Sequence, residues 1–246
     1  MRFGKLPRRY DSRTLQLAKY LTPELPAAPA ASDNLARVYK ATGSNDPATL
    51  FPMDGNDRYG DCTIAALAHL QTMAFAFVGS KTIPTQSAAE ALYFQLTGGP
   101  DSGLDMLSVM TYIRKHEWLG VQPILAYAQI NLKNKNLVRQ CINLFGFVYT
   151  GFVVTGKTLS QFNSGQPWTA GQLIDEGHCV VLADYDTGTG YVDALTWGAV
   201  EPATWPWFAE CVDEAYVLLP AAAAMPGYIP GFDSAQLLAD LAAVTA

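Results

Sequence analysis

Three segments in the first half of the chain have the apolar pattern of helices. Residues 63–78 are apolar on nearly every helical face, which is typical of a helix buried on all sides. Residues 87–96 predict a second helix. Residues 104–118 predict an amphipathic helix, with Met106 and Met110 on its apolar face.

Strand patterns dominate the second half of the chain. The predicted elements are a helix over 137–144, strands over 147–154, 178–185, 191–197 and 215–219, and a closing helix over 233–244. The Gly- and Thr-rich residues 186–190 separate two of these strands and predict a hairpin. Because helices come first and strands later, the order favours an α+β fold over a doubly wound parallel sheet.

The first sixty residues have weaker patterns. Residues 11–21 predict a short helix that begins at Asp11 or Ser12. Residues 22–33 are rich in Pro and Ala and predict an extended linker. Residues 35–60 contain scattered Pro and Gly and predict a loop.

Composition and charge exclude several classes of protein. Of 246 residues, 50% are hydrophobic and 15% are charged, so a disordered chain is excluded and a large core or two joined subdomains can form. The formal net charge is −6 and no basic run is interleaved with aromatics, so nucleic acid is not expected as a partner. Residues 1–9 are basic but precede no apolar stretch. We therefore expect no secretory signal, no membrane span, and a solvated tail rather than a surface-binding arm.

The sulfur and imidazole groups are few and scattered. The chain has three histidines and four cysteines, which are Cys62, Cys141, Cys179 and Cys211. No C-x-x-C pair occurs, so we expect no metal site, no cofactor and no disulfide, and a cytoplasmic location. Cys141 and Cys211 are interpreted as small buried hydrophobes.

Cys62 and His178 have the placement of a nucleophile and its base. Cys62 begins the most apolar predicted helix, with Asp61 as a candidate N-cap, and a helix N-terminus lowers the pKa of a thiol. His178 begins a strand far downstream. The two residues can meet across a cleft between a helical half and a β half, as thiol acyl transfer requires.

In this order the motifs resemble those of the papain superfamily of cysteine peptidases. That family has Gln six residues before its Cys, where this chain has Asn56 before Cys62. Its histidine strand runs to a Tyr, as His178 does to Tyr185, and its return strand ends in Trp-Gly, as at Trp197. Residues 101–106 resemble the Gly-rich loop that lines the family's cleft.

The resemblance implies a papain-like two-lobed fold, in which a helical lobe with the buried nucleophile helix packs against an antiparallel β-barrel-like lobe. The expected boundaries are an arm and linker over 1–48, a catalytic domain over 49–230 and a C-terminal helix over 231–246. Within the catalytic domain the helical lobe covers about 49–118 and the β lobe about 119–230.

The resemblance also implies site roles and a peptide or protein substrate. Cys62 would be the nucleophile, His178 the base, and Asn56 an oxyanion donor beside the Cys62 N–H. Three further residues, Ser102, Gly103 and Trp197, would contact the substrate.

The partner that orients the imidazole of His178 stays open at this point. Aligned through the tryptophan, the family's Asn becomes Leu195, which has no polar atom to offer. Asp193 lies on the same face of the strand and could reach the imidazole only if the hairpin register slips. Thr196, a backbone carbonyl or a water are the alternatives.

The predicted function is a cysteine peptidase-like hydrolase that acts on peptide or isopeptide bonds. One alternative is acyl transfer to an amine, as in transglutaminases or ligases, because the same acyl-enzyme serves both reactions. The other is a catalytically dead papain-like scaffold, either a binding protein or a virion or assembly component whose arm docks to a partner.

Overall fold

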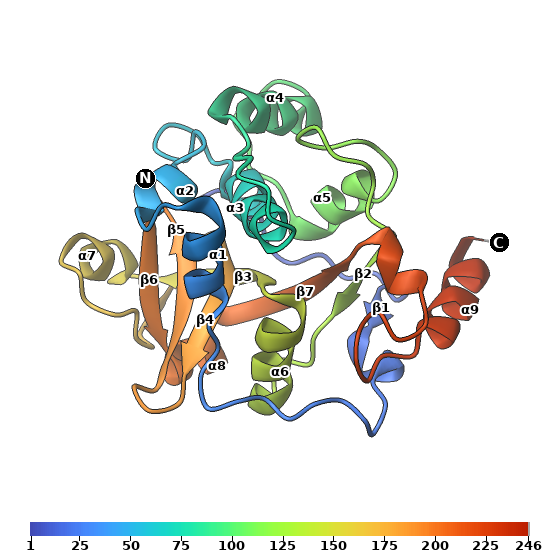
Figure 1. The fold of residues 1–246 in the computed structure, drawn as a ribbon. Helices are drawn as coiled ribbons and strands as arrows, with labels where there is room; N and C mark the ends of the chain where they lie inside the picture. The colour runs from blue at the N-terminus through green and yellow to red at the C-terminus, as the bar shows by residue number, and fades with distance from the viewer. Residues whose placement is uncertain (246) are drawn as a thin grey trace.

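A sheet of seven strands runs through the molecule in the computed structural model, which describes residues 1–245 (Figure 1). Its strand order is β1-β2-β7-β3-β4-β5-β6, and every neighbouring pair is antiparallel except β1 with β2. The strands are β1 (Leu15–Gln16), β2 (Ala126–Gln129), β3 (Val148–Thr155), β4 (Leu173–Asp186), β5 (Tyr191–Thr196), β6 (Ala199–Thr204) and β7 (Val212–Leu219).

The helices lie on both sides of this sheet, with α3, α4 and α5 grouped together at the top of Figure 1. The α-helices are α1 (Asn34–Thr42), α2 (Pro47–Leu50), α3 (Cys62–Phe77), α4 (Gln86–Thr97), α5 (Met106–Ile113), α6 (Lys135–Phe145), α7 (Thr158–Asn163), α8 (Trp205–Cys211) and α9 (Ser234–Thr245). Two short 3-10 helices are η1 (Leu17–Tyr20) and η2 (Ala221–Ala224).

Buried side chains alternate between the two faces of the sheet along its central strands. In β4, Val180 and Leu182 pack into the core that contains residues of α6 and α8. Cys179, Val181 and Ala183 pack into the other core, around α3. Successive residues of one strand therefore face different cores.

The helix pattern of the sequence is confirmed for α3, α4, α6 and α9, whose ends lie within two residues of the predicted ones. The predicted helix over 104–118 is shorter, because the Asp105 side chain accepts a hydrogen bond from the Ser108 N–H and starts α5 at Met106. Its far end is replaced by a tight turn in which Trp118 and Val121 pair.

Two predictions for the first sixty residues are wrong. Residues 11–21 form the short strand β1 and the 3-10 helix η1 rather than an α-helix, and residues 35–60 contain α1 and α2 rather than a loop alone. The helix α1 is stabilised from a distance, because the Asp184 carboxylate of β4 accepts the N–H groups of Asn34 and Leu35, each at 2.9 Å. A cap that comes from 150 residues away has no local sequence signal.

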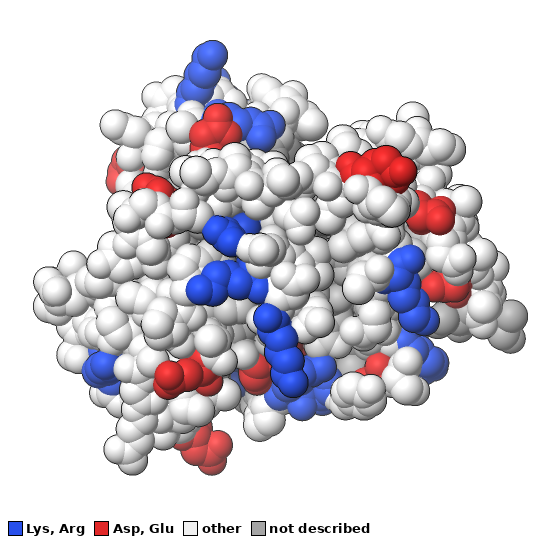
Figure 2. Space-filling model, turned by 90° about the horizontal axis from the view of Figure 1, so that it is seen from below, with Lys and Arg blue, Asp and Glu red and all other residues white. Residues whose placement is uncertain are grey.

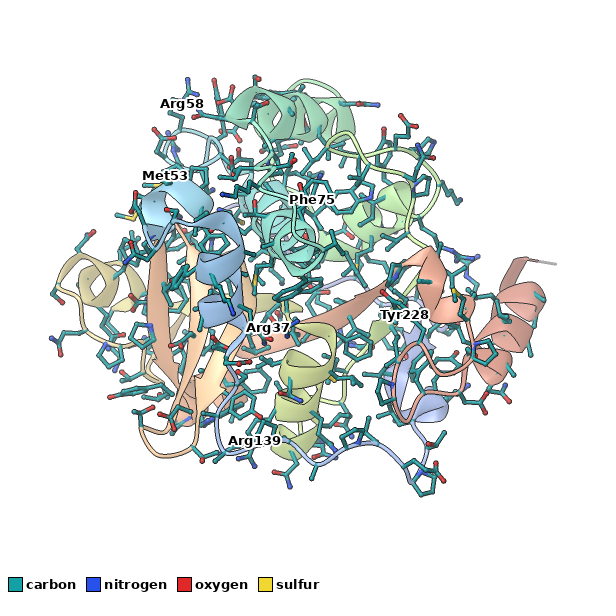
Figure 3. All side chains as sticks on the ribbon, in the orientation of Figure 1. Arg37, Met53, Arg58, Phe75, Arg139 and Tyr228 are labelled. Atoms are coloured by element: carbon teal, nitrogen blue, oxygen red, sulfur yellow. The ribbon has the colours of Figure 1, made fainter. Side chains whose placement is uncertain are left out.

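A second contact holds α1 against the end of α3. The guanidinium of Arg37, labelled in Figure 3, lies 4.6 Å from the centroid of the Phe77 ring. A cation over an aromatic face is attracted by the ring quadrupole. Together with α1, the helices α4 and α5 and the sheet pack around α3, in agreement with its apolar sequence.

On the face shown in Figure 2, Lys and Arg side chains lie in a row through the middle, and Asp and Glu side chains lie beside them and toward the edges. In residues 1–245, the helices are too short or too polar for any of them to cross a bilayer.

Candidate active site

Cys62 is the first residue of α3 and is buried, as the apolar helix predicts. Asp61 occupies the N-cap position of α3, as predicted, but its side chain makes no capping hydrogen bond. Both carboxylate oxygens of Asp61 are buried without a hydrogen-bond partner, and burial raises the pKa of this carboxyl to about 8. A neutral Asp61 therefore sits one residue before the thiol at moderately acidic pH.

The thiol of Cys62 is protonated in this conformation. Burial raises its pKa to about 12, and this effect outweighs the backbone N–H groups of Cys179 and Gly4, which act on the sulfur in the opposite direction. The N–H of Cys179 belongs to the residue next to His178, so the thiol lies beside the strand that carries the imidazole.

His178 lies in β4, and the two nitrogens of its imidazole have different surroundings. Nε2 is 2.8 Å from Thr196 Oγ1. Nδ1 is buried without a hydrogen-bond partner among the described residues, so it is not bonded to the Cys62 thiol here. The indole of Trp197 stacks on the imidazole at 4.4 Å between centroids, and burial lowers the pKa of His178 to about 3.

Thr196, one of the alternatives weighed for orienting the imidazole, occupies that position. In β5, Ala194 and Leu195 belong to different cores, so Thr196 shares the face of Ala194 while Asp193 shares the face of Leu195. Asp193 pairs with Asp184 in the sheet and makes no hydrogen bond to His178. Burial and the neighbouring carboxylates raise the pKa of Asp193 to about 6.

Asn56 links the two sides of the site. Its Oδ1 accepts a hydrogen bond of 2.6 Å from the indole N–H of Trp197, and its Nδ2 donates to the Tyr59 carbonyl at 3.0 Å. These bonds fix the orientation of the amide, whose side chain also acts on the Asp61 carboxyl and lowers its pKa against the larger effect of burial. We call residues 56–62 and 101–105 the helical wall of the cleft, and residues 177–178, 196–197 and 213–214 its sheet wall.

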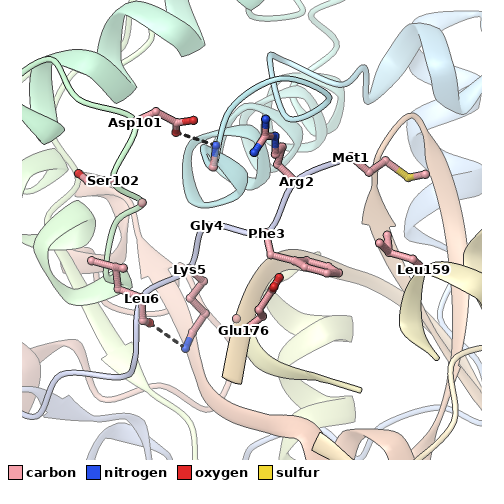
Figure 4. A pocket seen from close by; sticks show the side chains of 13 residues that line it. Met1, Arg2, Phe3, Gly4, Lys5, Leu6, Asp101, Ser102, Leu159 and Glu176 are labelled. Atoms are coloured by element: carbon pink, nitrogen blue, oxygen red, sulfur yellow. Dashed lines mark hydrogen bonds between the residues drawn. The ribbon is translucent and has the colours of Figure 1, made fainter. Parts of the chain in front are cut away.

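Residues 1–6, which we call the cleft segment, lie between these two walls (Figure 4). The N–H groups of Gly4 and Lys5 donate to the Gly177 carbonyl of the sheet wall at 3.2 and 3.0 Å. On the other side, the Leu104 N–H donates to the Gly4 carbonyl and the Leu6 N–H to the Leu104 carbonyl, both at 3.0 Å. The expectation of a solvated tail is therefore wrong for these residues.

Glycines on both walls allow the cleft segment to approach so closely. A Cβ on Gly103 would lie 2.4 Å from the Gly4 carbonyl oxygen, and one on Gly177 would lie 2.4 Å from that of Lys5. Gly4 itself is equally confined, because a Cβ there would lie 1.9 Å from the Gly60 carbonyl oxygen. The cleft is thus shaped for the main chain of a peptide.

Two of the predicted substrate contacts, Ser102 and Gly103, line a cavity beside the cleft segment. A cavity of about 570 Å³ is lined by the cleft segment together with Ser102, Gly103 and Gly177. Trp197 contacts the ring of Phe3 at 5.8 Å between centroids, and His178 contacts it at 5.7 Å. Ser102, Gly103 and Trp197, the residues predicted to contact the substrate, therefore lie beside a peptide, and this peptide is the cleft segment of the same chain.

Sequence reasoning missed the residues that bind this segment through side chains. Lys5 is buried and pairs with Asp213 and Glu214 of the sheet wall. An isolated Lys near a chain end and two acids on a late strand carry no motif. An Asp-Glu pair entering an otherwise apolar strand is the one local signal.

Among residues 1–245, no group of three or more His, Cys, Asp or Glu side chains has the arrangement of a metal site. The four cysteines are free and buried. The reactive groups that the described residues bring to the cleft are the Cys62 thiol and the His178 imidazole.

Comparison with known proteins gives a fold but no sequence family. The sequence matches no family model and no curated protein. The structure is similar to that of xylellain, a cysteine protease from Xylella fastidiosa, with a TM-score of 0.66 and 14% identity over 89% of this chain and 96% of that one. It is also similar to procathepsin B S9 from Trypanosoma congolense, with a TM-score of 0.58 and 11% identity over 89% of this chain and 86% of that one.

These similarities show that the chain has a papain-like fold of the α+β class, as the motifs of the sequence predict. The shared fold extends over most of each chain, so both lobes are included rather than the α3 region alone. Fold alone does not determine chemistry, which has to be argued from the cleft itself.

Proposed function

We propose that this protein is a cysteine peptidase-like hydrolase that cleaves peptide or isopeptide bonds, with Cys62 as nucleophile and His178 as general base. The observation that carries the proposal is a peptide main chain held in a glycine-lined cleft between these two residues. A cleft that hydrogen-bonds backbone groups on both sides accepts an extended peptide with little regard to most of its side chains.

A hydrogen bond on one nitrogen of the His178 imidazole supports the proposed role as base. With Nε2–H donating to Thr196, Nδ1 is left as the acceptor and is free to take the thiol proton. The thiolate attacks the substrate carbonyl. The Cys62 backbone N–H and the Asn56 side-chain amide then donate hydrogen bonds to the oxyanion. His178 then protonates the leaving amine, and water hydrolyses the thioester.

The cleft segment keeps this pair in its neutral forms. Burial raises the pKa of the Cys62 thiol and lowers the pKa of His178, and both effects disfavour the thiolate–imidazolium pair. When the segment leaves, water and substrate dipoles reach both groups, and the charged pair becomes accessible. We therefore infer that activity requires displacement of residues 1–6.

The test is labelling of the full chain with a peptide that carries an electrophile, read by mass spectrometry. Gly4→Ala places a methyl group against the Gly60 backbone and should expel the cleft segment, whereas Gly156→Ala meets only an ordinary contact at 3.9 Å. Cys62 should be modified at least about tenfold faster in Gly4→Ala than in wild type or Gly156→Ala. Hydrogen exchange of residues 2–6 reports whether the segment has moved.

A non-catalytic binding protein is the second candidate, and the unpartnered Asp61 beside the thiol favours it, since a carboxylate there would oppose a thiolate. The same experiment separates the two. If Cys62 stays unmodified in a Gly4→Ala protein whose residues 2–6 exchange freely, the peptidase proposal fails.

A further inference from the structure

The side chain of Lys5 leaves the cleft segment and enters a narrow channel in the sheet wall. Only 1% of this side chain is exposed. It passes Gly151 of β3, where a Cβ would lie 2.2 Å from Lys5 Cε and 2.5 Å from Met106 Sδ. The missing side chain of Gly151 thus makes the room, and what fits there is a long and unbranched side chain.

The channel ends at two carboxylates. Lys5 Nζ lies 2.9 Å from Asp213 Oδ2 and 3.1 Å from Glu214 Oε1. The Glu214 side chain is fully buried, and its other oxygen accepts a hydrogen bond of 2.9 Å from the Tyr216 hydroxyl. A carboxylate fixed in this way at the end of an apolar passage is a receptor for a cation, because a buried charge needs a counter-charge.

The cation comes from a segment that must leave before the enzyme can work. Lys5 follows Gly4, whose N–H acts on the Cys62 sulfur, so the channel opens about one residue along the cleft from the nucleophile. The Arg8 guanidinium also lies near this end, but it bonds the Asp213 backbone carbonyl and does not enter the channel. When residues 1–6 leave, Asp213 and Glu214 lose the cation that compensates them.

We propose that this channel, past Gly151 to Asp213 and Glu214, is a specificity subsite for a lysine or arginine side chain of the peptide substrate, which Lys5 fills in the resting protein. The inference rests on the proposed function and gives it a substrate class, namely basic peptides. Figure 4 shows Lys5 directed from the cleft segment toward the sheet wall, on the side away from Asp101.

The first test uses cleavage by the full-length Gly4→Ala protein. Fluorogenic peptides carry Lys, Arg, norleucine or Glu at each position near the scissile bond in turn. At one position, Lys and Arg should be preferred over norleucine by about tenfold or more in kcat/KM. Asp213→Asn and Glu214→Gln should each reduce that preference, whereas Glu201→Gln, at a buried carboxylate of β6, should leave it unchanged.

The second test needs no catalysis. The labelled peptide Arg-Phe-Gly-Lys-Leu-Pro and its norleucine analogue are titrated into the Gly4→Ala, Cys62→Ala protein. The lysine peptide should bind about tenfold or more tightly, and Glu214→Gln should remove the difference. If binding discriminates while no peptide is cleaved by the Cys62 protein, the subsite stands and the peptidase proposal fails.

A third measurement covers the case in which Gly4→Ala does not open the cleft. Lys5→Met keeps the length of the side chain and removes its charge, Lys5→Arg keeps the charge, and Arg9→Met removes an exposed charge nearby. Exchange of residues 2–6 should rise by about tenfold or more in Lys5→Met alone. Cleavage without a basic preference, equal binding of the two peptides, or unchanged exchange in Lys5→Met would each overturn the inference.

Discussion

The two walls of the cleft each contain a carboxyl group that is withdrawn from water, but only one of these groups has a counter-charge. On the helical wall, Asp61 has no hydrogen-bond partner for either oxygen. On the sheet wall, Glu214 is bonded by Tyr216 and paired with Lys5. Burial raises the pKa of both, yet Lys5 opposes the shift at Glu214. The same type of side chain thus lacks a counter-charge beside the nucleophile and has one where the cleft holds a peptide.

In the comparison the nucleophile stands on the helical wall, the base and the carboxylates that bind a cation stand on the sheet wall, and substitutions can test this division. The largest effect is expected at the nucleophile. Cys62→Ala should abolish peptide cleavage and Cys62→Ser should nearly do so, because neither supplies a thiolate. Cys141→Ala, at a buried cysteine of α6, is the matched control and should retain turnover. Full turnover in Cys62→Ala would refute the assignment.

The second effect concerns Asn56, which stands on the helical wall and is oriented by the indole of the sheet wall. Asn56→Ala should lower kcat by about 10²–10³ if the amide donates to the oxyanion. Trp197→Phe keeps the ring and removes only the N–H that holds Asn56, so it should cost less. A loss below threefold in Asn56→Ala, with an unchanged circular dichroism spectrum, would exclude the role.

The third effect concerns the residue of the sheet wall that orients the imidazole of His178. Thr196→Val removes the hydroxyl that holds Nε2 of His178 and should lower kcat by roughly 5- to 100-fold, the value of one buried hydrogen bond of about 1–3 kcal/mol. Asp193→Ala should change kcat less than threefold, since Asp193 faces the other core. Steady-state kinetics that showed the reverse order would restore Asp193 as the orienting group.

The last effect concerns stability rather than turnover and is a pH dependence at Asp61. Its pKa is raised from 3.8 to about 8 on folding, so the folded protein binds more protons than the unfolded chain between these values. The free energy of unfolding therefore falls as pH rises through this range. Asp61→Asn should remove that dependence, which amounts to at most about 1.4 kcal/mol per pH unit.

Urea unfolding at pH 5 and pH 8 measures this difference. Asp57→Asn, at a half-exposed neighbouring carboxyl group, provides the comparison and should follow wild type. If Asp61→Asn loses the same free energy as wild type between the two pH values, Asp61 is ionised in the folded protein and the contrast between the walls disappears.

What the sequence could predict of the site follows from how local each signal is. The helix behind Cys62 carries its signal in its own sixteen residues, and it forms where predicted. His178 lies on the predicted strand for the same reason. The partner of the imidazole depends on strand parity, and counting back from Trp197 by the family spacing leads to Leu195, which faces the other core.

No local pattern in the sequence predicts that residues 1–6 occupy the cleft. Lys5 and Asp213 are separated by 208 positions, and nothing near either residue indicates the other. A basic tail and a cleft ligand have the same composition. Only the glycines at 103 and 177 hint that a main chain passes close by, and a glycine in a loop has simpler explanations.

The hydrogen bond between Asn56 and Trp197 has a mechanical consequence. It joins the loop before α3 to the end of β5, so it links the helical lobe to the β lobe. Parting of the lobes would break this bond, whereas release of residues 1–6 from the groove would leave it intact. We therefore expect the segment to leave by losing its own hydrogen bonds to the two walls. The time needed for the first turnover should then depend on how fast residues 1–6 are released, and it should be insensitive to how freely the lobes move.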